Sequence, residues 1–97
     1  MMENNLEFLR RVVVNADKDY TLRKAAEECM ELATALLQQV NKPTKNYTNE
    51  IEEEISHVSM RLLMISELYN KENIQEQFNR KCENMKRWER DKGYKNL

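Results

Sequence analysis

Residues 20–41 read YTLRKAAEECMELATALLQQVN, and this stretch decides the fold class of the chain. Apolar residues recur in it at spacings of three and four, which is the period of an amphipathic helix. The apolar positions are Leu22, Ala25, Ala26, Cys29, Leu32, Ala33, Leu36 and Val40. Pro43 ends the pattern, because proline has no N–H to donate and disfavours helical geometry in the residue before it. The stretch therefore predicts a long helix with one apolar side.

Three further segments predict helices. They are residues 3–15, residues 48–69 with Thr48 as N-cap, and a last helix that starts in a capping box at Asn73 and ends at Gly93. One glycine and one proline are too few for the recurring turns of an all-β fold. We expect a single all-α domain over residues 1–97, built as a four-helix bundle with Phe78, Cys82 and Met85 pointing inward.

The third predicted helix carries more apolar surface than one chain can cover. Its main stripe is Ile51, Ile55, Val58, Leu62, Ile65 and Tyr69. Met60, Leu63 and Met64 lie outside that stripe. Large exposed apolar patches usually mark an interface, so we expect oligomerisation to complete the bundle, with a symmetric homodimer as the simplest form.

Composition excludes several classes of function. Charged residues make up 34% of the chain but the net charge is only −1, which argues against a nucleic-acid binder with its strongly basic surface. No apolar run approaches the ~20 residues of a membrane span, and the N-terminal residues do not resemble a signal peptide. Cys29 and Cys82 form neither a disulfide framework nor a zinc motif. We expect a cytoplasmic protein that contacts neither nucleic acid nor membrane.

Two carboxylate clusters predict a metal site. The first contains Glu27, Glu28 and Glu31, and the second contains Glu54 three residues before His57. Residues three apart share a helix face, where like charges repel. A hard cation would relieve that repulsion, since carboxylate oxygens are its preferred ligands. The alternative is that such glutamates form a solvated face, as we expect for Glu50, Glu52 and Glu53.

The order of these motifs resembles the all-α nucleoside triphosphate pyrophosphatase superfamily, the MazG-like proteins. That family carries an E-E-x-x-E motif on one helix and an E-x-x-D motif on the next. Glu27, Glu28 and Glu31 match the first motif, and the second is represented by Glu54 and His57. A third element of the family, with Lys, Asn and Arg on the following helix, is represented by Lys81, Asn84 and Arg87. The resemblance covers about residues 20–92.

The resemblance implies a metal-dependent hydrolase that cleaves an NTP or dNTP to the monophosphate and pyrophosphate. It implies Mg²⁺, with Mn²⁺ possible, held by Glu28, Glu31 and Glu54 with His57 as a further ligand. The catalytic residues would be Glu27 and Glu28, of which Glu27 would orient a water. Lys81, Asn84 and Arg87 would bind the polyphosphate. The resemblance also implies assembly as a homodimer or homotetramer.

His57 departs from the family pattern, which has an aspartate in its place. Imidazole suits Mn²⁺, Fe²⁺ or Zn²⁺ better than Mg²⁺, so His57 could ligate a softer metal. It could also act as a base or hydrogen-bond donor near phosphate, or mark a site whose catalysis has decayed. Two alternatives to the enzyme therefore stand: a catalytically degenerate relative that binds nucleotide or metal, and a helical interaction module.

Overall fold

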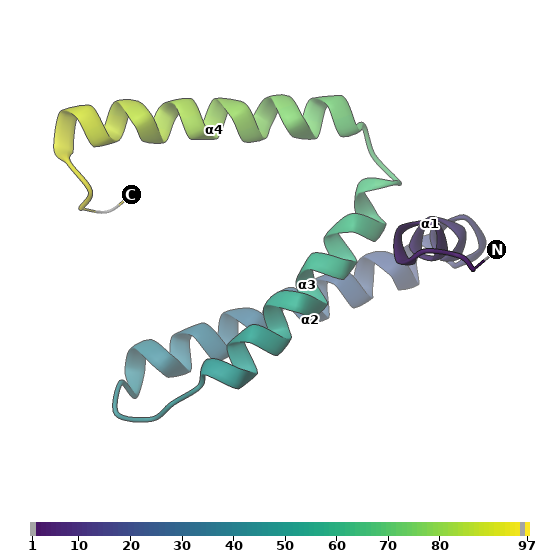
Figure 1. The fold of residues 1–97 in the computed structure, drawn as a ribbon, viewed down its shortest axis with the longest axis horizontal. Helices are drawn as coiled ribbons and strands as arrows, with labels where there is room; N and C mark the ends of the chain where they lie inside the picture. The colour runs from purple at the N-terminus through teal and green to yellow at the C-terminus, as the bar shows by residue number, and fades with distance from the viewer. Residues whose placement is uncertain (1, 96) are drawn as a thin grey trace.

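The computed structural model describes residues 2–95 and 97. These described residues form four α-helices and no strand: α1 (Asn5–Asn15), α2 (Lys18–Asn41), α3 (Thr48–Ser66) and α4 (Lys71–Lys92), as Figure 1 shows. The predicted all-α class is therefore confirmed. None of these helices combines the length and the apolar composition that crossing a bilayer requires.

Three of the helices, α1, α2 and α4, start at a side chain that accepts a hydrogen bond from a free backbone N–H group. Asp17 accepts from the Tyr20 backbone N–H at 2.9 Å and begins α2. Asn70 accepts from the Asn73 N–H at 3.0 Å and is the N-cap of α4, three residues before the predicted cap at Asn73, so α4 begins at Lys71. Thr48 is the first residue of α3 and not its cap, which is Tyr47 without a side-chain hydrogen bond. The predicted caps were wrong by one to three residues, as expected where several polar residues adjoin a helix start.

An antiparallel hairpin of α2 and α3 is the centre of the fold. Small or β-branched residues make the contact, namely Thr21, Ala25 and Ala35 of α2 and Val58 of α3, all of them buried. The connecting loop is held by Gln39, whose side chain donates to the Lys45 carbonyl at 2.8 Å and accepts from the Tyr47 N–H at 3.0 Å. The hairpin therefore has a fixed register, and this register aligns the two carboxylate clusters.

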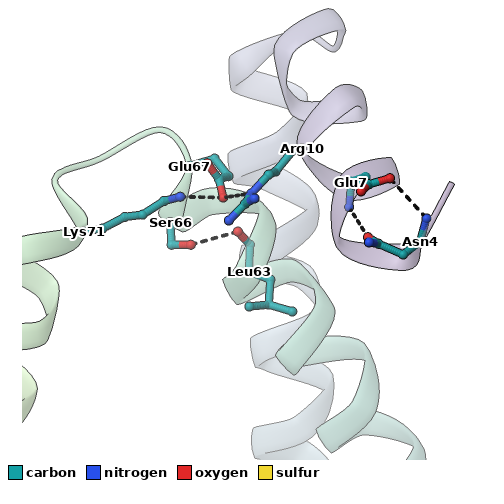
Figure 2. A network of polar contacts seen from close by, with 7 residues as sticks. All are labelled: Asn4, Glu7, Arg10, Leu63, Ser66, Glu67 and Lys71. Carbon is teal, nitrogen blue, oxygen red and sulfur yellow. Dashed lines mark hydrogen bonds and ion pairs between the residues drawn. The ribbon is translucent and has the colours of Figure 1, made fainter.

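The short helix α1 packs against the C-terminal half of α3. Leu9 and Val13 of α1 cover Met64, which is 4% exposed. At the edge of this contact Glu67 accepts hydrogen bonds from Arg10 at 2.9 Å and from Lys71 at 2.7 Å (Figure 2). Glu67 therefore links α1 and the start of α4 to the end of α3. Met64, expected to add to an exposed surface, is instead covered by α1.

Helix α4 leads away from the end of α3 and does not pack along the hairpin (Figure 1). Among residues 71–92, all of which the structure describes, none is buried. Phe78 is 64% exposed and Met85 is 38% exposed, so their predicted inward packing is not made within the chain. Gly93 ends the helix as predicted, with a φ of +75° that favours glycine.

Candidate metal centre

Three of the predicted ligands meet where α2 and α3 pack together. His57 Nδ1 lies 3.5 Å from Glu28 Oε2 on the neighbouring helix and 3.8 Å from Glu54 Oε2 on its own helix. One donor atom from each of the three residues lies within 4.8 Å of the others. Because Glu54 and His57 are three residues apart on α3, one turn of helix places both toward α2. The helical spacing on α3 and the register of the hairpin together bring Glu28, Glu54 and His57 close to one another.

Two oxygens in this cluster have no hydrogen-bond partner among the described residues. They are Glu28 Oε2 and Glu54 Oε2, and both atoms are buried. The two side chains are only 19% and 20% exposed. A buried carboxylate oxygen without a partner carries a desolvation cost. A divalent cation would satisfy both oxygens, so the residues present fit a metal ion.

Glu31 adds a third carboxylate to the same place. Its pKa lies above the usual value of 4.5, first because of the negative charge of Glu54, then because of desolvation and the charge of Glu28. Glu31 is exposed, one turn beyond Glu28 on α2. The charges of Glu54 and Glu28 therefore disfavour ionisation of Glu31, and a bound cation would oppose this effect.

The cluster opens onto an acidic groove. Glu27, Glu31, Glu50 and Glu54 line a hollow of about 460 Å³ between α2 and the start of α3. Glu27 forms an ion pair with Lys24, whose Nζ lies 3.1 Å from Glu27 Oε2, so the charge of the Glu27 carboxylate is partly neutralised. Four carboxylates around one hollow would repel a polyphosphate unless cations were bound there. The groove therefore has the size of a ligand site but requires metal ions to accept an anion.

Comparison with known proteins finds no family model, curated protein or solved structure that matches the chain. The resemblance to MazG-like proteins therefore stays a prediction from the motifs. The two helices that carry the motifs are adjacent and antiparallel, and their acids converge.

The three predicted phosphate-binding residues are not brought to this cluster. Lys81, Asn84 and Arg87 lie together on α4, where they border one shallow hollow and Arg87 donates a hydrogen bond to Asn84. Helix α4 stands apart from the hairpin, so this group and the carboxylate cluster are separate in the chain (Figure 1). The structure thus joins Glu28, Glu54 and His57 and leaves the third motif elsewhere.

Two cations near the cluster were given no role by the sequence. Arg61 lies one turn beyond His57, and its Nε is buried without a hydrogen-bond partner in the described chain. Arg61 is also close enough to Lys24 for its charge to oppose protonation of Lys24, although the pKa of Lys24 is raised on balance by Glu27. The spacing of Arg61, four residues after His57 and seven after Glu54, places it on the same helix face as these two residues from the sequence alone, but it predicted no role for Arg61.

Proposed function

We propose that the chain is a metal-dependent nucleoside triphosphate pyrophosphohydrolase. The reaction adds water across the bond between the α and β phosphates of an NTP or dNTP, giving the monophosphate and pyrophosphate. The observation that carries the proposal is the convergence of Glu28, Glu54 and His57 from two helices, with two buried carboxylate oxygens left without partners.

Mg²⁺ or Mn²⁺ is the proposed cofactor. Glu28, Glu54 and His57 would hold it, with Glu31 added from the next turn of α2. The bound ion would supply positive charge at phosphate oxygens and make water a stronger acid. An imidazole among the ligands favours Mn²⁺ over Mg²⁺, because Mg²⁺ prefers oxygen donors.

The remaining residues would position the substrate. Glu27 lines the groove and is oriented by Lys24, which suits it to accept a hydrogen bond from the attacking water. The same hairpin carries two cations, Lys24, which pairs with Glu27, and Arg61, which lies one turn beyond His57. Lys81, Asn84 and Arg87 would contact the polyphosphate only if α4 of this or another copy approached the groove. We include a homo-oligomer and a cytoplasmic setting in the proposal, in line with the free thiols of Cys29 and Cys82.

Pyrophosphate release tests the proposal. The protein is incubated with each common NTP and dNTP in the presence of Mg²⁺ or Mn²⁺. We expect at least one substrate to give equal amounts of monophosphate and pyrophosphate. Glu54→Gln should lose this activity, because it removes a ligand charge without changing side-chain size. Glu76→Gln makes the same change on the exposed surface of α4 and should retain it.

A second candidate is nucleotide or metal binding without turnover. It is favoured by the separation of Lys81, Asn84 and Arg87 from the carboxylates, and by His57 in the place of an acid. Metal and nucleotide binding by calorimetry, combined with silence in the pyrophosphate assay for every substrate and both metals, would support this candidate over the enzyme.

A further inference from the structure

Two cations lie on one side of the metal centre, and the acidic groove lies on the other. The groove extends toward the loop between α2 and α3, because Gln38 near the end of α2 and Glu50 near the start of α3 both line it. Lys24 and Arg61 lie in the opposite direction along the same two helices. An anion bound at the metal centre would therefore be repelled on the side of the loop and attracted on the other side.

The register of the hairpin places Arg61 opposite Lys24. Glu28 of α2 contacts His57 of α3. Lys24 lies one turn before Glu28, and Arg61 lies one turn after His57, which is the same direction along two antiparallel helices. The pKa of Lys24 is raised by its hydrogen bond with Glu27, and the nearby charge of Arg61 opposes this rise. The two cations therefore face each other one turn beyond the metal ligands.

The guanidinium of Arg61 has no strong acceptor within the described residues. Its Nη1 donates to the sulfur of Met64 at 3.8 Å, and a thioether is a weak acceptor. Its Nε is buried without a partner, and the residue as a whole is half-buried. Arg10 and Arg11, in contrast, each pair with a glutamate at 2.9 Å. A half-buried cation without an anion is costly, and a phosphate group matches the guanidinium fork.

We propose that Arg61, with Lys24 facing it, binds the β and γ phosphates of a triphosphate whose α phosphate lies at the metal centre. The nucleotide is taken from the proposed function, on which this inference rests. Arg61 lies roughly 6 Å along α3 from His57, a separation that neighbouring phosphates of one chain span. The polyphosphate then runs from the metal centre toward Arg61 and away from the acidic groove.

This placement assigns Arg61 and Lys24 to the leaving group. In the proposed hydrolysis the bond between the α phosphorus and the bridging oxygen breaks, and its electron pair stays with the departing pyrophosphate. The positive charges of Arg61 and Lys24 stabilise the negative charge that grows there. Both cations belong to the hairpin that carries the metal ligands, so they reach the polyphosphate without any approach of α4.

Inorganic tripolyphosphate tests this subsite without a nucleoside and without turnover. The Mn²⁺ complex of tripolyphosphate is titrated calorimetrically into the full chain. Arg61→Met should weaken its binding by about tenfold to 100-fold, the usual effect of losing hydrogen bonds to a charged group. Arg61→Lys keeps the charge but not the fork and should restore part of the affinity. Arg23→Met removes the same charge from the exposed side of α2 and should bind within about twofold of wild type.

The wild-type chain offers a measurement that needs no variant. Phenylglyoxal modifies arginine side chains, and mass spectrometry locates the modified residues. Saturating Mn²⁺ tripolyphosphate should slow the modification of Arg61 severalfold and leave that of Arg23 unchanged. The proposal is wrong if tripolyphosphate does not bind, or if it binds while Arg61 is modified at the same rate as in the free chain.

Thermal stability separates this role from a structural one. Arg61→Met should melt at the same temperature as the ligand-free wild type or higher, because an apolar side chain replaces a half-buried cation that faces Lys24. A lower melting temperature together with an unchanged affinity for tripolyphosphate would show that Arg61 only stabilises the fold.

The subsite and the proposed hydrolase fail separately. Binding of tripolyphosphate that depends on Arg61, without pyrophosphate release from any nucleotide, would exclude the hydrolase and support the subsite. Pyrophosphate release with the same kcat and KM in Arg61→Met as in wild type would support the hydrolase and exclude the subsite.

Discussion

His57 and Glu28 meet across the contact between α2 and α3, with His57 Nδ1 3.5 Å from Glu28 Oε2. The two residues belong to different helices, so a cation bound to both would join the helices of the hairpin. Metal binding and stability are linked wherever the folded chain alone presents the ligand set. This link provides measurements of the metal centre that need no substrate.

Mn²⁺ should stabilise the wild-type chain against heat. At free metal about 100-fold above its dissociation constant, the gain is about 2.7 kcal/mol. The melting temperature should rise with added Mn²⁺ and return to its starting value with a chelator. Glu54→Gln should lose most of the rise, and Glu76→Gln should keep it. An equal rise in melting temperature in all three proteins would show that Glu54 does not ligate the ion.

His57→Asp should turn the centre toward Mg²⁺. The change replaces a nitrogen donor by a charged oxygen donor, and Mg²⁺ prefers oxygen. We expect the affinity for Mg²⁺ relative to Mn²⁺ to rise by roughly tenfold, or about 1.4 kcal/mol, in calorimetric titrations. Ser56→Asp adds the same charge one residue away, on the exposed side of α3, and should leave the ratio unchanged. An unchanged ratio in His57→Asp would show that His57 is not a ligand.

Glu31→Gln should make the metal-free chain more stable near neutral pH. The pKa of Glu31 is raised in the folded chain, chiefly by the charge of Glu54. Because the folded chain then holds the proton more tightly than the unfolded chain, this group favours folding as pH falls from above its folded pKa toward 4.5. In Glu31→Gln that part of the pH dependence should disappear from urea unfolding curves. If the stability of Glu31→Gln depended on pH in the same way as that of the wild type, the charge of Glu54 would not raise the pKa of Glu31.

Met64→Ala should test the small core under α1. Met64 is 4% exposed against Leu9 and Val13, so truncation leaves a cavity. Losses of about 2–5 kcal/mol are typical for such changes. Met60→Ala is the matched control, because Met60 is 36% exposed on the same helix. Urea unfolding should show a much larger loss for Met64→Ala; similar losses would mean that α1 does not cover Met64 in solution.

Local patterns were enough to predict the helices but not all of their contacts. The three-four spacing from Leu22 to Val40 and the stop at Pro43 depend on neighbouring residues only, and α2 ends at Asn41 as expected. The same spacing predicted an inward side for Phe78 and Met85, and in the structure both side chains are exposed. Periodicity in the sequence shows that one side of a helix is apolar. Which surface covers that side depends on the direction that the connecting residues give the helix.

For the candidate site too, the sequence predicts the local arrangement of residues but not the contacts between helices. The sequence by itself determined which acids share a turn of helix, since Glu54 and His57 or Glu28 and Glu31 are fixed by the 3.6-residue period. The tertiary structure alone decided that Glu28 comes within 3.5 Å of His57, and that Lys81, Asn84 and Arg87 remain on a helix apart from both. Helical period is a local property of the backbone. The pairing of one helix with another is set by packing between residues distant in sequence, where small residues such as Ala25 and Ala35 let α2 and α3 approach.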